Sequence, residues 1–508
     1  MTPPLRACDG RGMRSLLLRA LLVGGILINV AFLLINLSPA RPHLIARSKL
    51  RVLMRASGSR VKWVKENQLD EFGAANDVEL EVVPAASFDE ALEILRKEKE
   101  HPTGIVLADI NDELADDARN GGMVRPVQSL LKPRDLQEMI PDYLPEAISR
   151  ATDKGVLWFV PKRALVDVAV WLKPAVEDAY LHWAEQRAQI DAALKEANGV
   201  GLPADYQLEK SPDAWDTYDL FVAAWSWAHR PAEWAAVPGE QPTIAPRVAF
   251  RTGLNEDATD DLFGSFFRFG MKEGEATHFD APAVLDWLQW EALFRKHHLL
   301  APECEKPEGI DGFGVNSLLH ERKLAWAPID QADSLWLHGG ARRDGDAGMP
   351  GASDLAWSTM PSGASLELNP KGEAARTGKS FSLEEVHFWA VPIHAPRPEL
   401  GVQLARFLTQ TGLHQREAEA VGLLPVRQDL RDQYPVVFRL EWMQQMLDAS
   451  YRQLDRGSGD LPDEVTDQGY DKKFVALREK VLAGVPDVTL AGVRARVALF
   501  SKETEHGR

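Results

Sequence analysis

The chain has 508 residues, of which 45% are hydrophobic and 26% are charged. This composition is typical of folded globular proteins and argues against disorder, while the length exceeds what one hydrophobic core usually covers, so we expect two or more lobes. The formal net charge of -17 argues against nucleic acid as a partner and provides little attraction to anionic lipid headgroups.

The N-terminal segment contains an uncharged run at residues 20–37, interrupted only by Asn29 and Asn36. This run is long enough to span a bilayer as a helix. A cleaved secretory signal would have a shorter apolar region, of about 7 to 15 residues, and a small-residue cleavage site, for which residues 38–40 offer a mediocre match. We therefore expect residues 20–38 to be a retained transmembrane anchor, with a cleaved signal as the alternative, after a short cytoplasmic tail at residues 1–19.

The position of the body relative to the membrane follows from its length. Long downstream domains translocate largely regardless of their charge, so we expect the body outside the cytoplasm. The two cysteines, Cys8 and Cys304, would then lie on opposite sides of the membrane and could not pair. Cys8 cannot be a lipoprotein acylation cysteine either, because it precedes the apolar run instead of directly following it.

The first part of the body shows alternating strand and helix patterns. Strands are expected at residues 50–54, 78–83 and 105–109, and helices at residues 60–76 and after Ser87. Ser87 and Glu90 form a capping box that predicts the start of the second helix. This order predicts an α/β lobe with a mostly parallel sheet.

Further helices are expected from Pro282 and from Pro398, each with an apolar stripe. Residues 177–197 have the pattern of an exposed amphipathic helix. Residues 339–378 are rich in Gly, Pro, Ser and charge, which predicts an exposed excursion around one short strand.

No catalytic motif is complete. Residues 372–380 resemble a phosphate-binding loop but place five residues between the glycines where the motif needs four. The carboxylates at residues 112–117 and 257–261 could bind a cation or act as an acid/base pair, but their density among few apolar neighbours favours solvated surfaces. His297 and His298 at a helix end favour capping over metal binding. The sequence therefore predicts neither an enzyme nor a cofactor or metal site.

Eight short segments, taken in order, resemble one known family. They are residues 104–109 (GIVLAD), 121–126 (GGMVRP), 153–161 (DKGVLWFVP), 169–174 (AVWLKP), 211–216 (SPDAWD), 323–328 (KLAWAP), 387–392 (HFWAVP) and 422–427 (GLLPVR). Their order is similar to that in bacterial extracellular solute-binding proteins of family 1, the maltose-binding type of ABC transporter substrate-binding protein. The resemblance spans about residues 50–490.

The resemblance implies a two-lobed α/β fold of the type 2 periplasmic-binding-protein kind, with ligand held between lobes that close by hinge motion. On this analogy the chain crosses between lobes near residues 160–165, near residues 356–361 and once more late in the chain. Lobe 1 is then expected to comprise residues 48–160 and 356–440. Lobe 2 is expected to comprise residues 161–355 and 441–495.

Candidate ligand-binding residues follow from the resemblance and from local chemistry. They are Ser57, Gly58, Ser59, Asp109, Asn111, Trp158, Lys162, Arg163, Trp326, Trp336 and Trp389. Residues 57–59 follow the first strand, where a tight turn and helix N-terminus present backbone N–H groups to a ligand. Asp109 and Asn111 occupy the equivalent end of a later strand, although a helix-capping role for Asp109 is an open alternative.

The tryptophans among these candidates suit sugar binding, because C–H-rich ring surfaces pack on aromatic faces. The tryptophans on helix faces, namely Trp63, Trp287 and Trp290, are expected in the core instead. Lys162 and Arg163 depart from the family pattern and make an anionic ligand an option. Because side chains alternate along a strand, we expect only one of the two to face the cleft.

The resemblance implies an extracytoplasmic component of an ABC importer at the bacterial inner membrane, which binds a carbohydrate or a small polar or anionic solute and delivers it to permease subunits. A membrane-tethered sensor or scaffold is the alternative, since an uncleaved helix limits free diffusion. A third hypothesis is a hydrolase, which would need two acidic side chains about 5 to 10 Å apart in one cleft.

Overall fold

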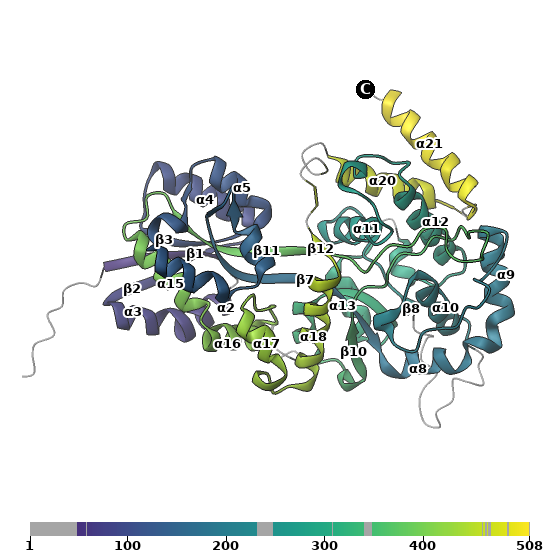
Figure 1. Cartoon of the computed structure of the whole chain (residues 1–508), viewed down its shortest axis with the longest axis horizontal. Coiled ribbons are helices and arrows are strands. Elements are labelled where there is room, and N and C mark those ends of the chain that lie inside the picture. The colour runs from purple at the N-terminus through teal and green to yellow at the C-terminus, as the bar shows by residue number, and fades with distance from the viewer. Residues whose placement is uncertain are drawn as a thin grey trace, which may run out of the picture.

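The structure of the chain is a computed structural model that describes residues 48–56, 58–230, 247–306, 308–339, 348–459, 461–462, 465, 469–484 and 487–506. The predicted cytoplasmic tail and membrane anchor lie outside these residues, as does Cys8. None of the helices within the described ranges has the length and apolarity needed to cross a bilayer. The body forms two lobes that are connected by long strands (Figure 1).

The first lobe contains the predicted parallel sheet. Its strands are β1 (Ser48–Arg55), β2 (Val78–Ala85) and β3 (Ile105–Asn111), with β1 in the middle. Its helices include α2 (Gly58–Val64), α3 (Asp70–Asn76), α4 (Phe88–Glu100), α5 (Asp112–Asn120), α15 (Pro398–Leu408) and α16 (Thr411–Val421). The predicted start of α4 is confirmed, since Ser87 is its N-cap and the Ser87 hydroxyl accepts from the Glu90 N–H at 3.1 Å. The reciprocal half of the capping box is shifted by one residue, because the Glu90 carboxylate accepts from the Ala86 N–H at 2.6 Å and not from the Ser87 N–H.

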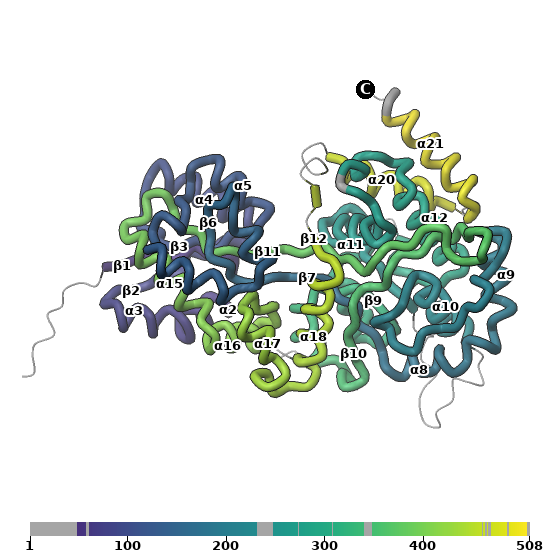
Figure 2. The backbone as a smooth tube through the Cα atoms, in the orientation of Figure 1, coloured from purple at the N-terminus to yellow at the C-terminus, as the bar shows by residue number. Residues whose placement is uncertain are grey.

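Two long antiparallel strands, β7 (Val160–Leu172) and β11 (Ser382–Pro392), join the lobes. The sheet runs in the order β2-β1-β3-β11-β7-β9-β8, so both lobes share one continuous set of strand pairings. The first half of β7 pairs with β11, and its second half pairs with β9 (Leu324–Asp330) and β10 (Leu355–Ser358). β7 and β11 therefore belong to both lobes, and Figure 2 shows them spanning the gap between the two bodies.

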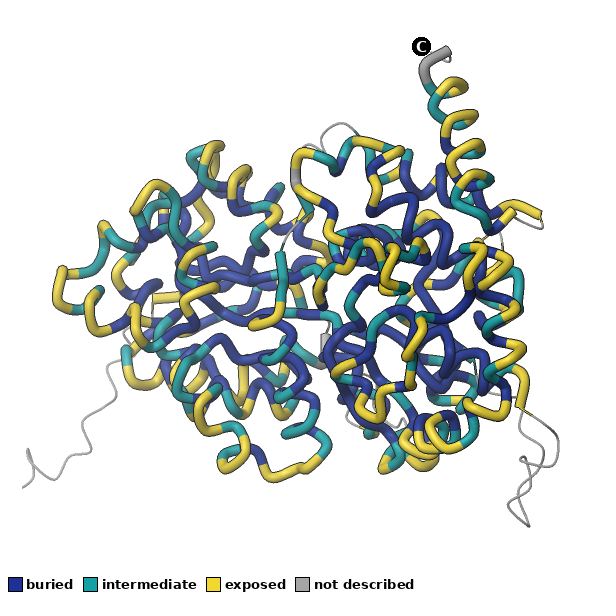
Figure 3. Tube along the Cα trace, turned by 45° about the vertical axis from the view of Figure 1, so that its right-hand side comes forward, coloured by how far each residue is buried: buried dark blue, intermediate teal, exposed yellow. Residues whose placement is uncertain are grey.

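The second lobe packs helices around the far half of the sheet, which ends at β8 (Arg247–Val248). Its helices include α8 (Lys173–His182), α9 (Arg187–Asn198), α10 (Thr217–Ala228), α11 (Glu256–Arg268), α12 (Pro282–Lys296), α13 (Gly312–His320), α14 (Ser334–Leu337), α20 (Tyr470–Leu482) and α21 (Leu490–His506). Trp287 and Trp290 are buried in its core, as the sequence predicts, and Trp290 contacts Tyr218 edge-on at 4.9 Å. Figure 3 shows buried chain at the centre of both lobes.

The second crossing between lobes lies later in the chain than predicted. Residues 356–361 do not cross, because β10 pairs with the far half of β7 inside the second lobe. The chain that follows stays on that lobe, where the Trp290 Nε1–H donates to the Ala364 carbonyl at 2.7 Å. The crossing occurs at β11, so residues 356–381 belong with the second lobe and not the first. A short apolar strand in a core and one in a hinge have the same sequence pattern, which explains the misplacement.

The final crossing separates α17 (Gln428–Val437) from α18 (Glu441–Arg456). α17 lies beside α16, whereas α18 packs against β10 and β7. The chain therefore ends on the second lobe, with α20 and α21 against α12. Figure 1 shows α21 extending along the outer edge of that lobe.

Two predicted surface segments are more buried than expected. The single helix predicted at residues 177–197 is two helices, α8 and α9, separated by a 3-10 turn, and α9 buries Ile190 and Leu194. The predicted exposed excursion contains fully buried Leu366, and its residues 340–347 lie outside the described chain. Small and polar residues can pass over a lobe without being exposed, since the backbone still pairs with its neighbours.

Candidate functional site

A cleft of about 1940 Å³ lies between the lobes. β7 and β11 form its floor through residues 163–167 and 383–387. The first lobe contributes the segments that follow β1, β2 and β3, and the second lobe contributes residues of α11, α13 and α14. The carboxyl ends of the parallel strands thus meet at the cleft, which is where open α/β sheets bind ligands.

Acidic side chains dominate the lining of the cleft. Eleven carboxylates face four guanidinium groups: Glu90, Asp112, Glu113, Asp116, Asp167, Glu256, Asp257, Asp260, Asp330, Glu384 and Glu385 against Arg55, Arg60, Arg163 and Arg251. Several belong to the stretches 112–117 and 257–261, for which the sequence favours solvated surfaces. Solvent exposure is confirmed for Glu113, Asp116 and Asp117, whereas Asp257 and Asp260 are half-buried and Asp261 is buried. The prediction is therefore wrong for the second stretch, because local charge density does not reveal that two distant surfaces face each other across a cleft.

Arg163 and Trp336 are the two predicted ligand-binding residues that line the cleft. Gly58 and Ser59 begin α2, between the lining residues Ala56 and Arg60, and Ser57 lies outside the described chain. Trp326 is buried in the second lobe against Phe250, and partly buried Trp158 packs on the core of the first. The remaining predicted residues, Asp109, Asn111, Lys162 and Trp389, are buried behind the wall of the first lobe.

A buried charge network of Asp109, Lys162, Arg163, Glu385 and His387 extends from that wall to the cleft, which Arg163, Glu385 and His387 line. Lys162 Nζ donates to Asp109 Oδ2 at 2.5 Å, and Arg163 Nε donates to His387 Nδ1 at 3.0 Å. His387 Nε2 lies 3.2 Å from Glu385 Oε1. The network forms because β3, β11 and β7 are neighbours in the sheet, so their side chains meet on one face.

The network compensates its acidic members. Burial alone would raise the pKa of Asp109, but Lys162 and Arg163 outweigh it and hold that pKa well below its usual range. Burial would also raise the pKa of Glu385, but its interactions with His387 and Asn111 outweigh burial and lower that pKa to about 2. Lys162 also lies 4.3 Å from the centre of the Trp389 ring, a cation–π contact. Burial and Arg163 lower the pKa of Lys162 to about 7, against the attraction of Asp109. Lys162 is thus a fully buried structural residue that does not reach the cleft.

Arg163 occupies the boundary between the network and the cleft. As strand alternation predicts for residues 162 and 163, only Arg163 reaches the cleft lining. Its side chain is almost fully buried, at 3% exposure, and its Nη1 has no hydrogen-bond partner among the described residues. A buried N–H without a partner is costly, so Arg163 is poised to donate to a ligand oxygen.

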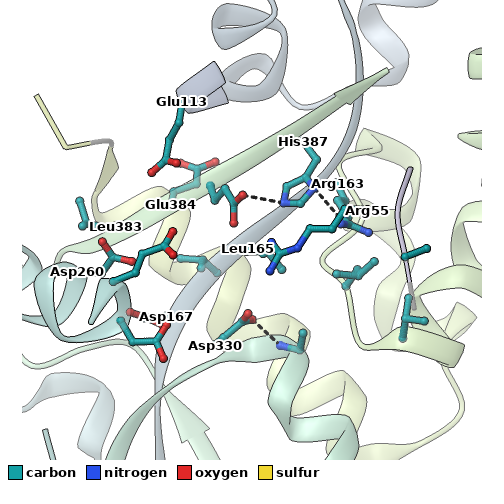
Figure 4. Close-up of a pocket in the computed structure, with 18 of the residues that line it drawn as sticks. Arg55, Glu113, Arg163, Leu165, Asp167, Asp260, Asp330, Leu383, Glu384 and His387 are labelled. Atoms are coloured by element: carbon teal, nitrogen blue, oxygen red, sulfur yellow. Dashed lines mark hydrogen bonds and ion pairs between the residues drawn. The ribbon is translucent and has the colours of Figure 1, made fainter. Parts of the chain in front are cut away.

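The other side of the cleft holds a carboxylate cluster, defined by Glu113 of α5, Glu256 and Asp260 of α11, and Glu384 of β11. Figure 4 shows Glu113, Glu384 and Asp260 on one side of Leu165, with Arg163, Arg55 and His387 on the other. Arg251 does not neutralise this cluster, because it pairs with Asp167 and, at 2.9 Å, with Asp261. Within the described part of the chain, no ion pair or hydrogen bond involves the carboxylates of Glu256 or Asp260.

The electrostatics of the cluster are opposite to those of the network. Burial raises the pKa of Asp260 well above its usual range, against the attraction of Arg251, and Asp167, Glu256 and Glu113 raise it further. Burial also raises the pKa of Glu256, with Glu385 and Asp257 adding to the effect. Even Asp167, which has Arg251 as its partner, has its pKa raised by burial to about 6. On this side of the cleft Arg251 pairs with Asp167 and Asp261, and Arg150 pairs with Asp112 and Glu384. Glu256 and Asp260 are therefore left without an ion-pair partner in the described chain.

Aromatic rings flank the cleft on both lobes. Trp63 of α2 lines it from the first lobe, and Trp336 and Phe313 line it from the second, where His320 stacks on Trp336 at 5.3 Å. Trp63 was expected in the core, and a helix-face position alone does not distinguish core from cleft. The usable signal for Trp63 was its place one turn into the helix that follows the first strand.

Solved structures with a similar fold cover almost the whole chain. A maltose-bound protein of T. maritima matches with a TM-score of 0.58 and 13% identity over 89% of this chain and 99% of that chain. A maltotriose-binding protein of Thermus thermophilus bound with maltotriose matches at 0.56 and 15% over 90% and 100%. An ABC substrate-binding protein of Listeria monocytogenes in complex with cycloalternan matches at 0.58 and 11% over 90% and 99%.

These likenesses establish the fold, a two-lobed α/β architecture shared with sugar-bound solute-binding proteins. No protein-family model matches the sequence, and none of the curated proteins matches it. At this level of identity, the ligand of the chain has to be argued from its own cleft.

Proposed function

We propose that this chain is the extracytoplasmic solute-binding component of an ABC importer, which binds a carbohydrate in the interlobe cleft by hinge closure. The observation that carries the proposal is the pair of aromatic surfaces, Trp63 and Trp336, on opposite lobes of a cleft hinged by β7 and β11. Hinge closure around a ligand is the usual motion of lobes joined in this way.

The lining favours a carbohydrate over the anionic solute that the sequence leaves open. A sugar presents ring faces that pack on aromatic side chains and edge hydroxyls that donate to carboxylates. An anion would instead have to enter a cleft in which carboxylates outnumber guanidinium groups eleven to four. Lys162, one of the two cations that suggest an anionic ligand, is buried against Asp109.

A tryptophan substitution tests the site directly. We expect Trp336→Ala to weaken sugar binding by about 30- to 100-fold, because aromatic anchors in binding sites commonly contribute about 2–3 kcal/mol. Trp63→Ala should have a similar effect from the other lobe. Trp158→Ala is the matched control, since Trp158 is partly buried but absent from the cleft lining.

The measurement is calorimetric titration of the full-length chain in detergent with a panel of linear and cyclic oligosaccharides. A ligand that binds the folded state also raises its free energy of unfolding, by about 2.7 kcal/mol at 100 times Kd. If no member of a broad sugar panel binds or stabilises the chain, the proposal is overturned. If Trp158→Ala weakens binding as much as Trp336→Ala, the site is misplaced.

The membrane attachment is part of the proposal and rests on the sequence. We propose that residues 20–38 remain as an anchor in the bacterial inner membrane, with the body in the periplasm or outside the cell beside ABC permease subunits. Replacing residues 1–46 with a cleavable signal tests the tether. Unchanged solute uptake would support transport and contradict the tethered sensor.

The hydrolase hypothesis is addressed by the same titrations. The cleft gathers several carboxylates, so a bound oligosaccharide meets acidic groups on both lobes. We expect the ligand to be recovered intact, because the structural neighbours are binding proteins. Chromatography of the ligand after prolonged incubation checks this expectation, and shortened products would overturn it.

A further inference from the structure

The carboxylate cluster is built from both lobes and from the hinge. Glu113 lies at the start of α5 in the first lobe, Glu256 and Asp260 lie on α11 in the second, and Glu384 lies on β11. Glu113 acts on Asp260 across the cleft, since it adds to the rise in the pKa of that group. The two lobes thus already repel each other at this point.

Closure of the cleft increases that repulsion. Hinge motion about β7 and β11 brings α5 and α11 together while expelling water that screens their charges. Arg251 is occupied by Asp167 and Asp261, and Arg150 pairs with Asp112 and Glu384. No cation of the described chain pairs with Glu256 or Asp260. A positively charged ligand would remove the repulsion and make closure favourable.

Two residues in the lining each have a buried polar atom without a hydrogen-bond partner among the described residues. Arg163, 3% exposed, has an unpartnered Nη1, and Asn316 of α13, 2% exposed, has an unpartnered Oδ1 among the described residues. Both residues line the cleft. A donor and an acceptor of this kind match the hydroxyl groups of a sugar, which accept and donate at one position.

A bound metal ion fits the cluster less well than an ammonium group. Among the residues that the structure describes, no group of three or more acidic, histidine or cysteine side chains converges as a metal site requires. An ammonium group accepts a wider arrangement, because its hydrogen-bond acceptors lie about 2.8 Å from the nitrogen, whereas metal–oxygen distances are about 2.0 to 2.6 Å. Charge-assisted hydrogen bonds from an ammonium to carboxylates are also stronger than neutral ones.

We propose that the solute is an amine-bearing sugar, whose protonated amine binds Glu113, Glu256 and Asp260 while its ring lies between Trp63 and Trp336 beside Arg163. This inference rests on the proposed function and specifies the substrate class of the same cleft. It assigns the carboxylates on α11 the role of selecting a cation and coupling its binding to closure.

The test compares two probes that share rings and linkages and differ in N-acetylation, which removes the charge of each amine. Glucosamine trisaccharide carries protonated amines, whereas its fully N-acetylated counterpart is neutral and keeps the same rings and linkages. We expect the full-length chain to bind the amine form at least 10-fold more tightly at pH 7. The preference should shrink as salt concentration rises, because exposed ion pairs are screened.

Matched variants identify the groups responsible. Glu256→Gln with Asp260→Asn should remove the preference for the amine form while retaining binding of the N-acetylated form. Asp205→Asn is the control, because Asp205 is an exposed acid of the second lobe outside the cleft. If the double variant keeps the 10-fold preference, or if the control loses it, the assignment of the cluster is overturned.

The outcomes separate this inference from the proposed function. Equal binding of the two trisaccharides, or tighter binding of maltotriose than of the amine form, overturns the cationic ligand and leaves the sugar-binding cleft intact. Binding of spermidine as tight as that of the amine form supports the ammonium site but overturns the sugar ring as part of the ligand. Absence of binding by all probes overturns both.

Discussion

Two charged regions border the same cleft and differ in whether their carboxylates have partners. In the buried charge network, Asp109 has Lys162 at 2.5 Å and Glu385 has His387 at 3.2 Å. In the carboxylate cluster, Glu256 and Asp260 have no such partner within the described chain. The network residues are buried, apart from half-buried Glu385, whereas Glu113 and Glu256 are exposed and Asp260 is half-buried. The two regions therefore differ in compensation and also in their access to water.

The pKa directions express this difference. Lys162 and His387 overcome burial and lower the pKa values of Asp109 and Glu385, whereas burial and neighbouring acids raise those of Asp260 and Glu256. A carboxylate with a lowered pKa already has partners in the folded chain that stabilise its charged form. One with a raised pKa in a cleft is a candidate for binding something from outside.

The largest expected effect comes from a substitution that breaks the buried charge network. Lys162→Met leaves Asp109 buried without its main partner, and we expect the free energy of unfolding to fall by about 3 kcal/mol, the lower end for a broken buried pair. Arg163 and His387 still face Asp109, which limits the loss. Urea unfolding followed by tryptophan fluorescence measures the change.

The control for this prediction removes both charges. Asp109→Asn together with Lys162→Met takes away the stranded carboxylate and should recover at least half of the loss, since replacing a whole buried pair is often nearly neutral. A double variant as unstable as Lys162→Met alone would show that packing on Trp389, at 4.3 Å, matters more than charge.

A smaller effect is expected at the edge of the network. Since the pKa of Glu385 is lowered to about 2 in the folded state, its stabilising contribution is present above the unfolded pKa and is lost as the pH falls toward 2. Glu385→Gln should therefore lower the free energy of unfolding at pH 7 by about 2 kcal/mol, allowing for partial exposure. The difference from the unaltered chain should vanish near pH 2.

The exposed strand residue Glu79 provides the comparison for that titration, because it makes no ion pair within the described chain. Glu79→Gln should change the free energy of unfolding by no more than about 0.5 kcal/mol at any pH. A pH-independent loss in Glu385→Gln would mean that the hydrogen bond from Asn111, at 3.0 Å, outweighs the charge.

Much of the fold could be predicted because its signals are local. Apolar runs identified β1, β2 and β3, and Ser87 with Glu90 identified the start of α4. The order of short segments predicted the two-lobed architecture. The crossing at β11 was missed because β10 has the same apolar pattern as a hinge strand.

The site was harder to predict because its parts are distant in sequence. Glu113 and Asp260 meet only through the hinge strands, so their stretches resemble ordinary solvated surfaces. Alternation predicted that only one of Lys162 and Arg163 faces the cleft, but not which one, since the register shift opposite Lys162 leaves no sequence signature. Trp63 differs from a core tryptophan only in what its helix faces.

The smallest expected effect has the opposite sign and tests the cluster. Because the pKa of Asp260 is raised in the folded state, its contribution to stability is greatest below the unfolded pKa and is lost as the pH rises through the folded value. Asp260→Asn cannot ionise, so we expect it to be more stable than the unaltered chain by about 1 kcal/mol at pH 7 and equally stable near pH 3. Thermal unfolding across this range checks it. Asp205→Asn should show no such gain, and a loss of stability in Asp260→Asn would mean that Arg251 already compensates this carboxylate, as Lys162 compensates Asp109.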